Sequence, residues 1–437
     1  MLLLSNIERL YDGTSAESSA LSTHVDIAIE GERILSVDPH RPERELGPAD
    51  RVVDCAGLTV TPGLVDCHGH VTVLGLRESE MAVMNTAAMM LYVEKILYTT
   101  LVDGGVTTMR DVGGATDLMK RLVDQGVMIG PRLKIAISML SSTGGHADFR
   151  GPDRCHAELS RLWPEGPGRP SSIVDGPWEC RKRVREVIAC GADVIKVCAS
   201  PGVASPSDHL EHRDFSPEEV AAITEEASAR GVRVAAHAHS QAGCELAIEN
   251  GVHDLQHISY MDERLVELAA RRGCTVTPTS WVMYELQEAE GLSDFVMEKV
   301  KKVAAVHANA VQSSARGELP ILMGTDPVLP GMHGRNYMEL HWLMHEGVGT
   351  LATWYGSTGL AAREIGATDT GTVVAGQRAD LLLGRGDVIA KPELFDQGAL
   401  LEVIKDGVGH RGHPGIPQRT FASTVRENLP QPPDSTS

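Results

Sequence analysis

The chain has 437 residues, of which 42% are hydrophobic and 23% are charged, and it carries a formal net charge of −19. That length exceeds one ordinary domain and fits a large domain with an accessory one. The negative charge, without any run of basic residues, argues against nucleic acid and anionic membranes as partners. The apolar start is four residues long, no stretch is long enough to span a membrane, and the eight cysteines show no paired spacing. We therefore expect a cytoplasmic protein with reduced thiols.

Residues 1–62 alternate short apolar runs with turns, which is typical of β-structure. Two runs flank Glu30-Gly31-Glu32, a pattern that indicates a hairpin, and the stretch 51–63 adds a further strand. We expect this region to form the first part of a small β-sandwich domain.

From residue 63 to residue 368, buried apolar runs alternate with helical patterns. The helix expected over Pro217–Arg230 opens with a capping box, with Ser216 as N-cap and Glu219 at the third helical position. Eight runs separated by helices indicate parallel strands and predict an α/β fold, the (β/α)8 TIM barrel. The proline- and glycine-rich stretch 148–178 breaks this rhythm. We expect it to be a loop over the active site rather than a disordered insertion.

Short strand patterns return after Gly371. Residues 369–420 are therefore expected to complete the β-sandwich domain begun at the N-terminus. The polar and proline-rich tail, residues 421–437, is predicted to be disordered.

Polar residues close five of the eight apolar runs. The stretch TPGLVDCHGH ends in His68 and His70, which alternation places on the same side of the chain. The spacing of the later residues assigns the five runs to strands 1, 4, 5, 6 and 8 of one barrel, whose strand ends meet at the active-site mouth. Those later residues are Lys196, His237, His257 and Asp326.

Four imidazoles and one carboxylate suit a divalent metal such as zinc, with cobalt or manganese as alternatives. An ammonium group at the same place would repel a metal ion. Lys196 fits there if CO2 converts its amine to a carbamate, whose two oxygens can bridge two metals. A structural salt bridge is the alternative interpretation of Lys196.

The motifs TPGLVDCHGH, GVTTMRDVGG, STGGHAD, GADVIKV, AAHAHS, LQHIS, MGTD and GTVVAGQRADLLL follow one another along nearly the whole chain. In this order they resemble the amidohydrolase superfamily. Within it, the chain is most similar to the branch of Xaa-Pro and Xaa-Arg dipeptidases, ochratoxin amidohydrolase, and molinate and phenylurea hydrolases.

The resemblance implies a centre of two divalent metal ions. It assigns one ion, the more buried, to His68, His70 and Asp326. It assigns the more exposed ion to His237 and His257, with N-carboxylated Lys196 as the bridge. His146, in the TGGH motif, matches a position that contacts the substrate carbonyl; an ordinary loop histidine is the alternative.

Three positions depart from the branch. His239 stands where many dipeptidases have a tyrosine that helps to bind the substrate carboxylate. Ser200-Pro201-Gly202 replaces Ser-Gly-Gly, and Gln256-His257-Ile258 replaces Glu-His-Gly. The first two differences weaken the case for a free dipeptide as substrate and leave metal binding intact.

We therefore predict a metal-dependent hydrolase that cleaves an amide-type C–N bond with metal-activated hydroxide. Asp326 would transfer the proton and His146 would stabilise the oxyanion. We expect a small, neutral and hydrophobic amide, carbamate, thiocarbamate or urea, as for molinate and phenylurea hydrolases in xenobiotic degradation.

The alternatives are an Xaa-Pro or Xaa-Arg dipeptidase, an N-acyl amino acid amidohydrolase of the ochratoxin type, a ring deaminase, and a metal-free binding protein. We expect a homo-oligomer.

Further substrate contacts are predicted at His239, Arg150, Trp281, Tyr284 and His333. For Trp281 and Tyr284, packing beneath the loops is an equal alternative to substrate contact.

Overall fold

Strands occupy most of residues 1–62 in the computed structural model, which describes residues 1–44, 46–75, 80, 84–148, 165–203 and 209–419. The expected hairpin is present, with Glu30 opposite Arg33. Residues 51–63, expected to form one strand, hold two, because a turn at Gly57 (φ +77°) separates them. The strands are β1 (Leu2–Ile7), β2 (Arg9–Tyr11), β3 (Leu21–Ser22), β4 (Val25–Glu30), β5 (Arg33–Pro39), β6 (Arg51–Asp54) and β7 (Leu58–Pro62), with a 3-10 turn at Ser18–Ala20.

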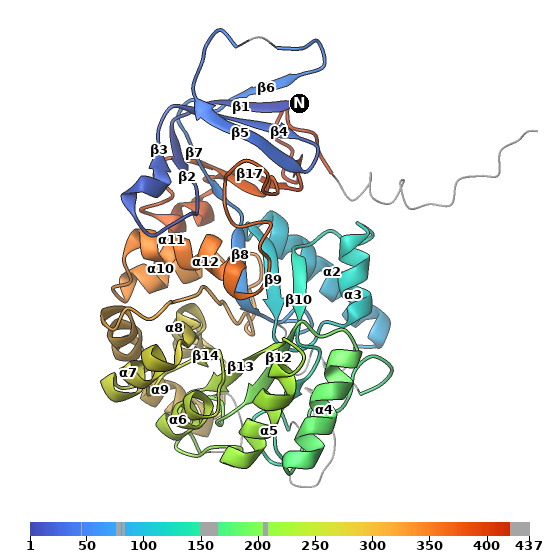
Figure 1. The fold of residues 1–437 in the computed structure, drawn as a ribbon, viewed down its shortest axis with the longest axis vertical. Coiled ribbons are helices and arrows are strands. Elements are labelled where there is room, and N and C mark those ends of the chain that lie inside the picture. Colours follow the sequence, from blue (N-terminus) through green and yellow to red (C-terminus); the bar gives the residue numbers. More distant parts are fainter. Residues whose placement is uncertain (45, 76–79, 81–83, 149–164, 204–208, 420–437) are drawn as a thin grey trace, which may run out of the picture.

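Both ends of the chain contribute to one sheet. β16 (Leu381–Arg385) pairs antiparallel with β7, and β17 (Leu400–Lys405) and β18 (Val408–Gly409) follow it, giving the order β18-β17-β16-β7-β2-β3. A second sheet has the order β5-β4-β1-β6, and the two share an apolar core. The C-terminal strands therefore join the sheet begun at the N-terminus, as expected, at the upper end of the molecule in Figure 1. A 3-10 helix, Pro392–Gln397, connects β16 to β17.

All strands between these two chain ends pair in parallel, in the orders β10-β9-β8 and β11-β12-β13-β14-β15. Asp193 N, just before β12, donates to Ile135 O (2.8 Å) and so links the two groups directly. At the other edge, Cys67 N of β8 donates to Met323 O (2.9 Å), in a segment that bridges to β15 through Ile321. The strands are β8 (Leu64–Gly69), β9 (Val106–Asp111), β10 (Arg132–Ile135), β11 (Met139–Leu140), β12 (Val194–Cys198), β13 (Arg233–Ala238), β14 (Asp254–His257) and β15 (Thr275–Thr277).

The run LPILMGTD, expected to be the eighth strand, forms only one parallel bridge, between Ile321 and Val276. Its backbone N–H groups bond to different neighbours: Leu322 to Val276, Met323 to Gly356 and Asp326 to His68. Such divided pairing gives no continuous ladder, although the run still lies between β15 and β8.

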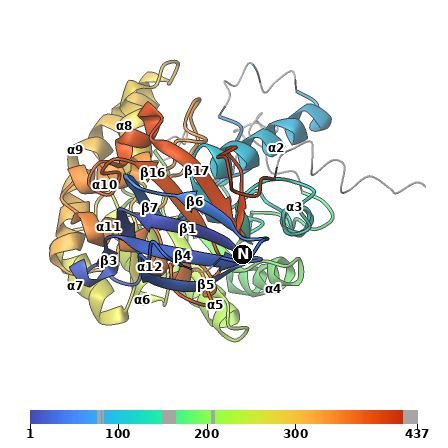
Figure 2. The same ribbon diagram turned by 90° about the horizontal axis from the view of Figure 1, so that it is seen from above.

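Helices alternate with the parallel strands, which confirms the α/β class, and Figure 2 shows them around the periphery. The predicted capping box of α5 is present, and the helix ends at Ser228 rather than Arg230. No helix of the described residues combines the length and apolarity needed to cross a membrane. The helices are α2 (Thr86–Val102), α3 (Asp117–Asp124), α4 (Pro177–Ala189), α5 (Pro217–Ser228), α6 (Gln241–Glu249), α7 (Glu263–Arg272), α8 (Ser280–Glu288), α9 (Asp294–Arg316), α10 (Met338–His345), α11 (Thr350–Gly356) and α12 (Gly359–Glu364).

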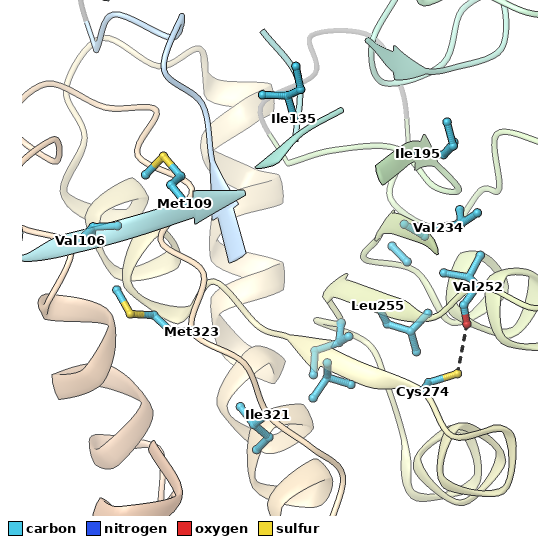
Figure 3. Close-up of a cluster of buried hydrophobic side chains, with 14 of the residues drawn as sticks. Val106, Met109, Ile135, Ile195, Val234, Val252, Leu255, Cys274, Ile321 and Met323 are labelled. Carbon is cyan, nitrogen blue, oxygen red and sulfur yellow. Dashed lines mark hydrogen bonds between the residues drawn. The ribbon is translucent and has the colours of Figure 1, made fainter. Parts of the chain in front are cut away.

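Apolar side chains of the parallel strands and of the surrounding helices form the main core, part of which Figure 3 shows around Met109, Ile195 and Leu255. Because side chains alternate along a strand, the neighbours of a core-facing residue point to the opposite face of the strand. Ile195 and Val197 both belong to this core, so Lys196 between them points to the opposite side of β12.

Candidate metal centre

Two histidines and an aspartate from different segments form the first group of potential ligands. His68 is the penultimate residue of β8, and His70 follows the end of the strand. Asp326 N donates to His68 O (2.8 Å), which holds the two segments side by side. The Nε2 atoms of His68 and His70 each lie 3.5 Å from Asp326 Oδ1. One atom of each residue can therefore meet at a single ion.

Three histidines of neighbouring strands form the second group. Ligand atoms of His237, His239 and His257 lie within 4.8 Å of one another. His237 is in β13 and His257 ends β14, and their ring centroids are 4.4 Å apart. The rings of His68 and His257 are 4.8 Å apart, so the two groups are adjacent.

Lys196 lies beside both groups, and only 1% of its surface is exposed. Burial lowers the pKa of its ammonium to about 8. Burial is the main cause that lowers the pKa of His68, and the charge of Lys196 is the next largest cause. The same charge also helps to lower the pKa values of His237 and His257. Among the described residues, Lys196 donates to the neutral amide oxygen of Gln256 and forms no ion pair, which removes support for a structural salt bridge.

The hydrogen bonds of the rings leave nitrogens ready to bind a metal. His70 Nδ1 lies 2.9 Å from the carbonyl oxygen of Gly113, which can only accept, so Nε2 keeps its lone pair. His257 Nδ1 lies 2.8 Å from Thr279 Oγ1, whose hydroxyl donates to the Pro278 carbonyl, so Nε2 is again unprotonated. Within the described part of the chain, this buried Nε2 has no hydrogen-bond partner. Such an orphaned acceptor beside other imidazoles fits a divalent metal.

The predicted carbonyl-contacting residue is close to the second group. The ring of His146 stacks on that of His237, with centroids 4.0 Å apart and planes at 19°. Gly202 leaves room for this arrangement, because a Cβ there would lie 2.1 Å from His146 Cε1. His146 is therefore brought to the ligands from a loop after β11.

The other predicted substrate contacts have different surroundings. His333 Nε2 donates to the carbonyl oxygen of Val73 (2.7 Å), so this nitrogen carries the proton. Trp281 is fully buried and donates to Glu285, and Tyr284 stacks on Trp342 with centroids 3.6 Å apart. Both aromatic side chains pack against protein, so their contact with substrate stays a prediction. Arg150, and residues 149–164 of the predicted loop, lie outside the described residues.

Sequence reasoning missed Lys299 of α9. Its side chain is buried, its ammonium donates to Gly202 O (2.9 Å), and its charge contributes to lowering the pKa of His239. No sequence pattern marks Lys299 as a buried residue, because it lies in a charged helical stretch typical of a solvent-exposed face. Only the packing of α9 reveals that this residue turns inward.

Residues 59–408 match the model of the amidohydrolase family. The chain belongs to this family. It is 32% identical to ochratoxinase of Aspergillus niger over 326 residues, which cover 71% of this chain and 66% of that protein, just under two thirds of its length. Membership confirms the resemblance inferred from the motifs.

Solved structures of related enzymes share the fold. A prolidase complexed with N-methylphosphonate-L-proline has a TM-score of 0.84 at 28% identity, covering 94% of this chain and 100% of that one. A. niger ochratoxinase has a TM-score of 0.80 at 27% identity, covering 94% and 95%. Molinate hydrolase has a TM-score of 0.77 at 17% identity, covering 100% and 98%, and this likeness concerns the fold alone.

Proposed function

We propose that this chain hydrolyses the amide bond of an N-acyl amino acid that carries an apolar group. The observation that carries the proposal is the meeting of two ligand groups around buried Lys196 in a chain 32% identical to an ochratoxinase. The metal ligands would be His68, His70, Lys196, His237, His257 and Asp326.

Zinc fits a set of imidazoles and carboxylate oxygens, with cobalt or manganese as alternatives. Divalent ions bound there would supply Lewis acidity and make hydroxide available near neutral pH. Lys196 would complete the ligand set as a carbamate. The amine attacks CO2 as its neutral form and loses one proton, and a pKa of about 8 leaves an appreciable neutral fraction at pH 7 to 8.

Two residues would move the proton and orient the carbonyl. Asp326 would take a proton from the attacking water and pass it to the leaving nitrogen. Burial raises the pKa of its carboxyl group, which favours this role. His146, stacked on His237, would contact the substrate carbonyl oxygen and stabilise its developing charge.

The substrate class proposed here is the alternative to the neutral molecule first expected. The likeness to ochratoxinase supports it, because molinate hydrolase shares only the fold. Lys299 also donates to Gly202 O near His146, and its charge contributes to lowering the pKa of His239. An apolar pocket of about 620 Å³ reaches Thr72, two residues past His70, and includes Leu74 and Met89.

The proposed architecture is a (β/α)8 barrel over residues 63–368, joined to a β-sandwich domain formed by residues 1–62 and 369–420. The hydrogen bonds that link β10 to β12, and residue 323 to β8, support closure of the barrel. A homo-oligomer located in the cytoplasm remains part of the proposal.

A substrate panel tests the proposal. The zinc-loaded enzyme is incubated with N-acyl amino acids, Xaa-Pro dipeptides, phenylureas, thiocarbamates and anilides, and we expect turnover of the N-acyl amino acids. Activity confined to neutral ureas and thiocarbamates would restore the neutral substrate, and activity confined to zwitterionic dipeptides would identify a dipeptidase. Fewer than one bound metal per chain after expression with zinc or cobalt would overturn the metal centre.

A further inference from the structure

A continuous chain of hydrogen bonds leads from His239 away from the metal centre. His239 Nδ1 lies 2.8 Å from Ser259 Oγ, and Ser259 Oγ lies 3.1 Å from His307 Nδ1. His307 Nε2 lies 3.4 Å from Ser280 Oγ, which donates to Glu346 Oε2 at 2.5 Å. We call Ser259, His307, Ser280 and Glu346 the relay. All four residues are buried.

The relay crosses three helices that the catalytic chemistry does not otherwise use. Ser280 begins α8, His307 is in α9, and Glu346 follows the end of α10. Its outer end is Tyr284, which is half-buried and donates to Glu346 Oε1 at 3.2 Å. A buried polar chain of this length is costly unless every member is paired, and here each member has a partner on both sides.

The two end states of the relay differ in the direction of every hydrogen bond. An ionised Glu346 can only accept, so Ser280 donates to it, His307 Nε2–H donates to Ser280, and Ser259 donates to His307 Nδ1. Ser259 then accepts from His239 Nδ1–H, which leaves a lone pair on His239 Nε2. When Oε2 of Glu346 is protonated, all these bonds reverse, and His239 Nε2 carries the proton.

We propose that Glu346 exchanges a proton with the active site through the relay and thereby sets whether His239 presents a lone pair or an N–H to the substrate. Glu346 is a positioning residue, because it acts only through His239. This role rests on the proposed function only where it concerns the substrate.

The exchange balances without charging any intermediate residue. A proton bound at His239 Nε2 releases the Nδ1 proton to Ser259, whose own proton passes to His307 Nδ1. His307 releases its Nε2 proton to Ser280, whose proton passes to Glu346. One N–H bond forms at the site and one O–H bond forms at Glu346, and the reverse sequence returns the proton.

The surroundings of Glu346 bring the pKa of its carboxyl group close to neutral pH. Burial raises the pKa of Glu346 to about 7, against the hydrogen bonds from Ser280 and Tyr284, which lower it. The titratable groups nearest it are Tyr284 of α8, which donates to it, and Glu339 of α10, with which it interacts electrostatically. His307 of α9 is reached through Ser280. Burial lowers the pKa of His307 to about 4, so above that pH His307 is neutral and has the one donor and one acceptor that the relay requires.

We expect the tautomer of His239 to depend on pH. In the zinc-loaded enzyme labelled with 15N-histidine, the Nδ1 and Nε2 signals of His239 should exchange their protonated and unprotonated positions in a transition near pH 7. Glu346→Gln and Ser280→Ala should both abolish the transition. Tyr284→Phe keeps the relay and removes a bond that stabilises the carboxylate, so its transition should move to higher pH.

The two disruptive variants separate the relay from a merely structural role. Ser280→Ala leaves Glu346 in place, and infrared spectroscopy should still detect its carboxylic acid titrating while His239 no longer responds. A transition at His239 that persists in both variants, or its absence from the wild type, overturns the inference. Because this readout needs no substrate, it holds or fails independently of the substrate panel.

With an N-acyl amino acid as substrate, KM in the wild type should rise about tenfold as pH increases through 7, because the carboxylate loses an N–H donor. In Glu346→Gln and Ser280→Ala the KM should be independent of pH over this range. A KM profile in either variant that still follows the wild type contradicts the coupling of the relay to substrate binding.

Discussion

At the scale of single residues, the histidines of the two ligand groups differ in how strictly their hydrogen bonds fix the tautomer of the ring. Gly113 and Thr279 fix the tautomers of His70 and His257 through direct hydrogen bonds. The tautomer of His239 instead depends on a chain that ends at an ionisable group. The rigid nitrogens suit metal binding, and the adjustable one suits contact with a substrate.

Replacing a ligand should therefore remove activity without unfolding the chain. We expect His237→Ala to lower kcat/KM by at least about a hundredfold, since even partners behind the ligands cost 10–100-fold, and to lower the metal content. Circular dichroism and the melting temperature should stay close to the wild type. His24, an exposed histidine, provides the control, and His24→Ala should keep full activity. A fully active His237→Ala would refute the assignment of His237.

Lys196 offers a test of its carbamate. Lys196→Ala should lose most activity and bind fewer metal ions, as measured by elemental analysis. Added acetate or propionate should restore part of both, because a small carboxylate has the two oxygens that the carbamate would supply. Lys196→Ala with unchanged metal content and activity would rule out a bridging role.

At the scale of helices and strands, the sequence predicted the parallel strands well because each is a short apolar run closed by a polar residue. β14 ends at His257 as this rule predicts, whereas Lys196 is the middle residue of β12, which continues to Cys198. The run ending in Asp326 lacks a ladder because its N–H groups bond to three different neighbours, which no local pattern encodes. The relay was missed for the same reason: Ser280, His307 and Glu346 meet only when three helices pack.

Helix α5 is an element whose first turn could be predicted from the local sequence alone. Its capping box was predicted from Ser216 and Glu219, and the structure contains both hydrogen bonds. We expect Ser216→Ala to lower the free energy of unfolding by about 1 kcal/mol, measured from urea denaturation, because the first turn loses a side-chain acceptor. Ser216→Asn keeps an equally good acceptor and should be close to the wild type. An Asn variant as unstable as the Ala variant would contradict the capping role.

At the scale of the whole molecule, the parallel strands are tied to the sheet formed by the chain ends. Arg132 of β10 pairs with Asp380 (2.7 Å), just before β16, and with Asp406 (2.6 Å), between β17 and β18. Asp380 is buried, so the pair is protected from solvent and salt. Burial opposes the ionised form of Asp406, yet Arg132 and its neighbours outweigh it and lower the pKa of Asp406 to about 2.

This network predicts how the free energy of unfolding falls as the pH becomes acidic. Because the folded-state pKa of Asp406 lies below its unfolded value near 3.8, its contribution is complete above about pH 4 and is lost as the pH falls towards 2. Arg132→Met should flatten the dependence of the unfolding free energy on pH between 4 and 2. At pH 7 it should cost about 3 kcal/mol, since Asp380 is left buried without its cation. Arg264→Met, which breaks an exposed pair with Glu245, is the matched control and should leave the curve unchanged. An Arg132→Met curve parallel to the wild type would show that acid stability arises elsewhere in the molecule.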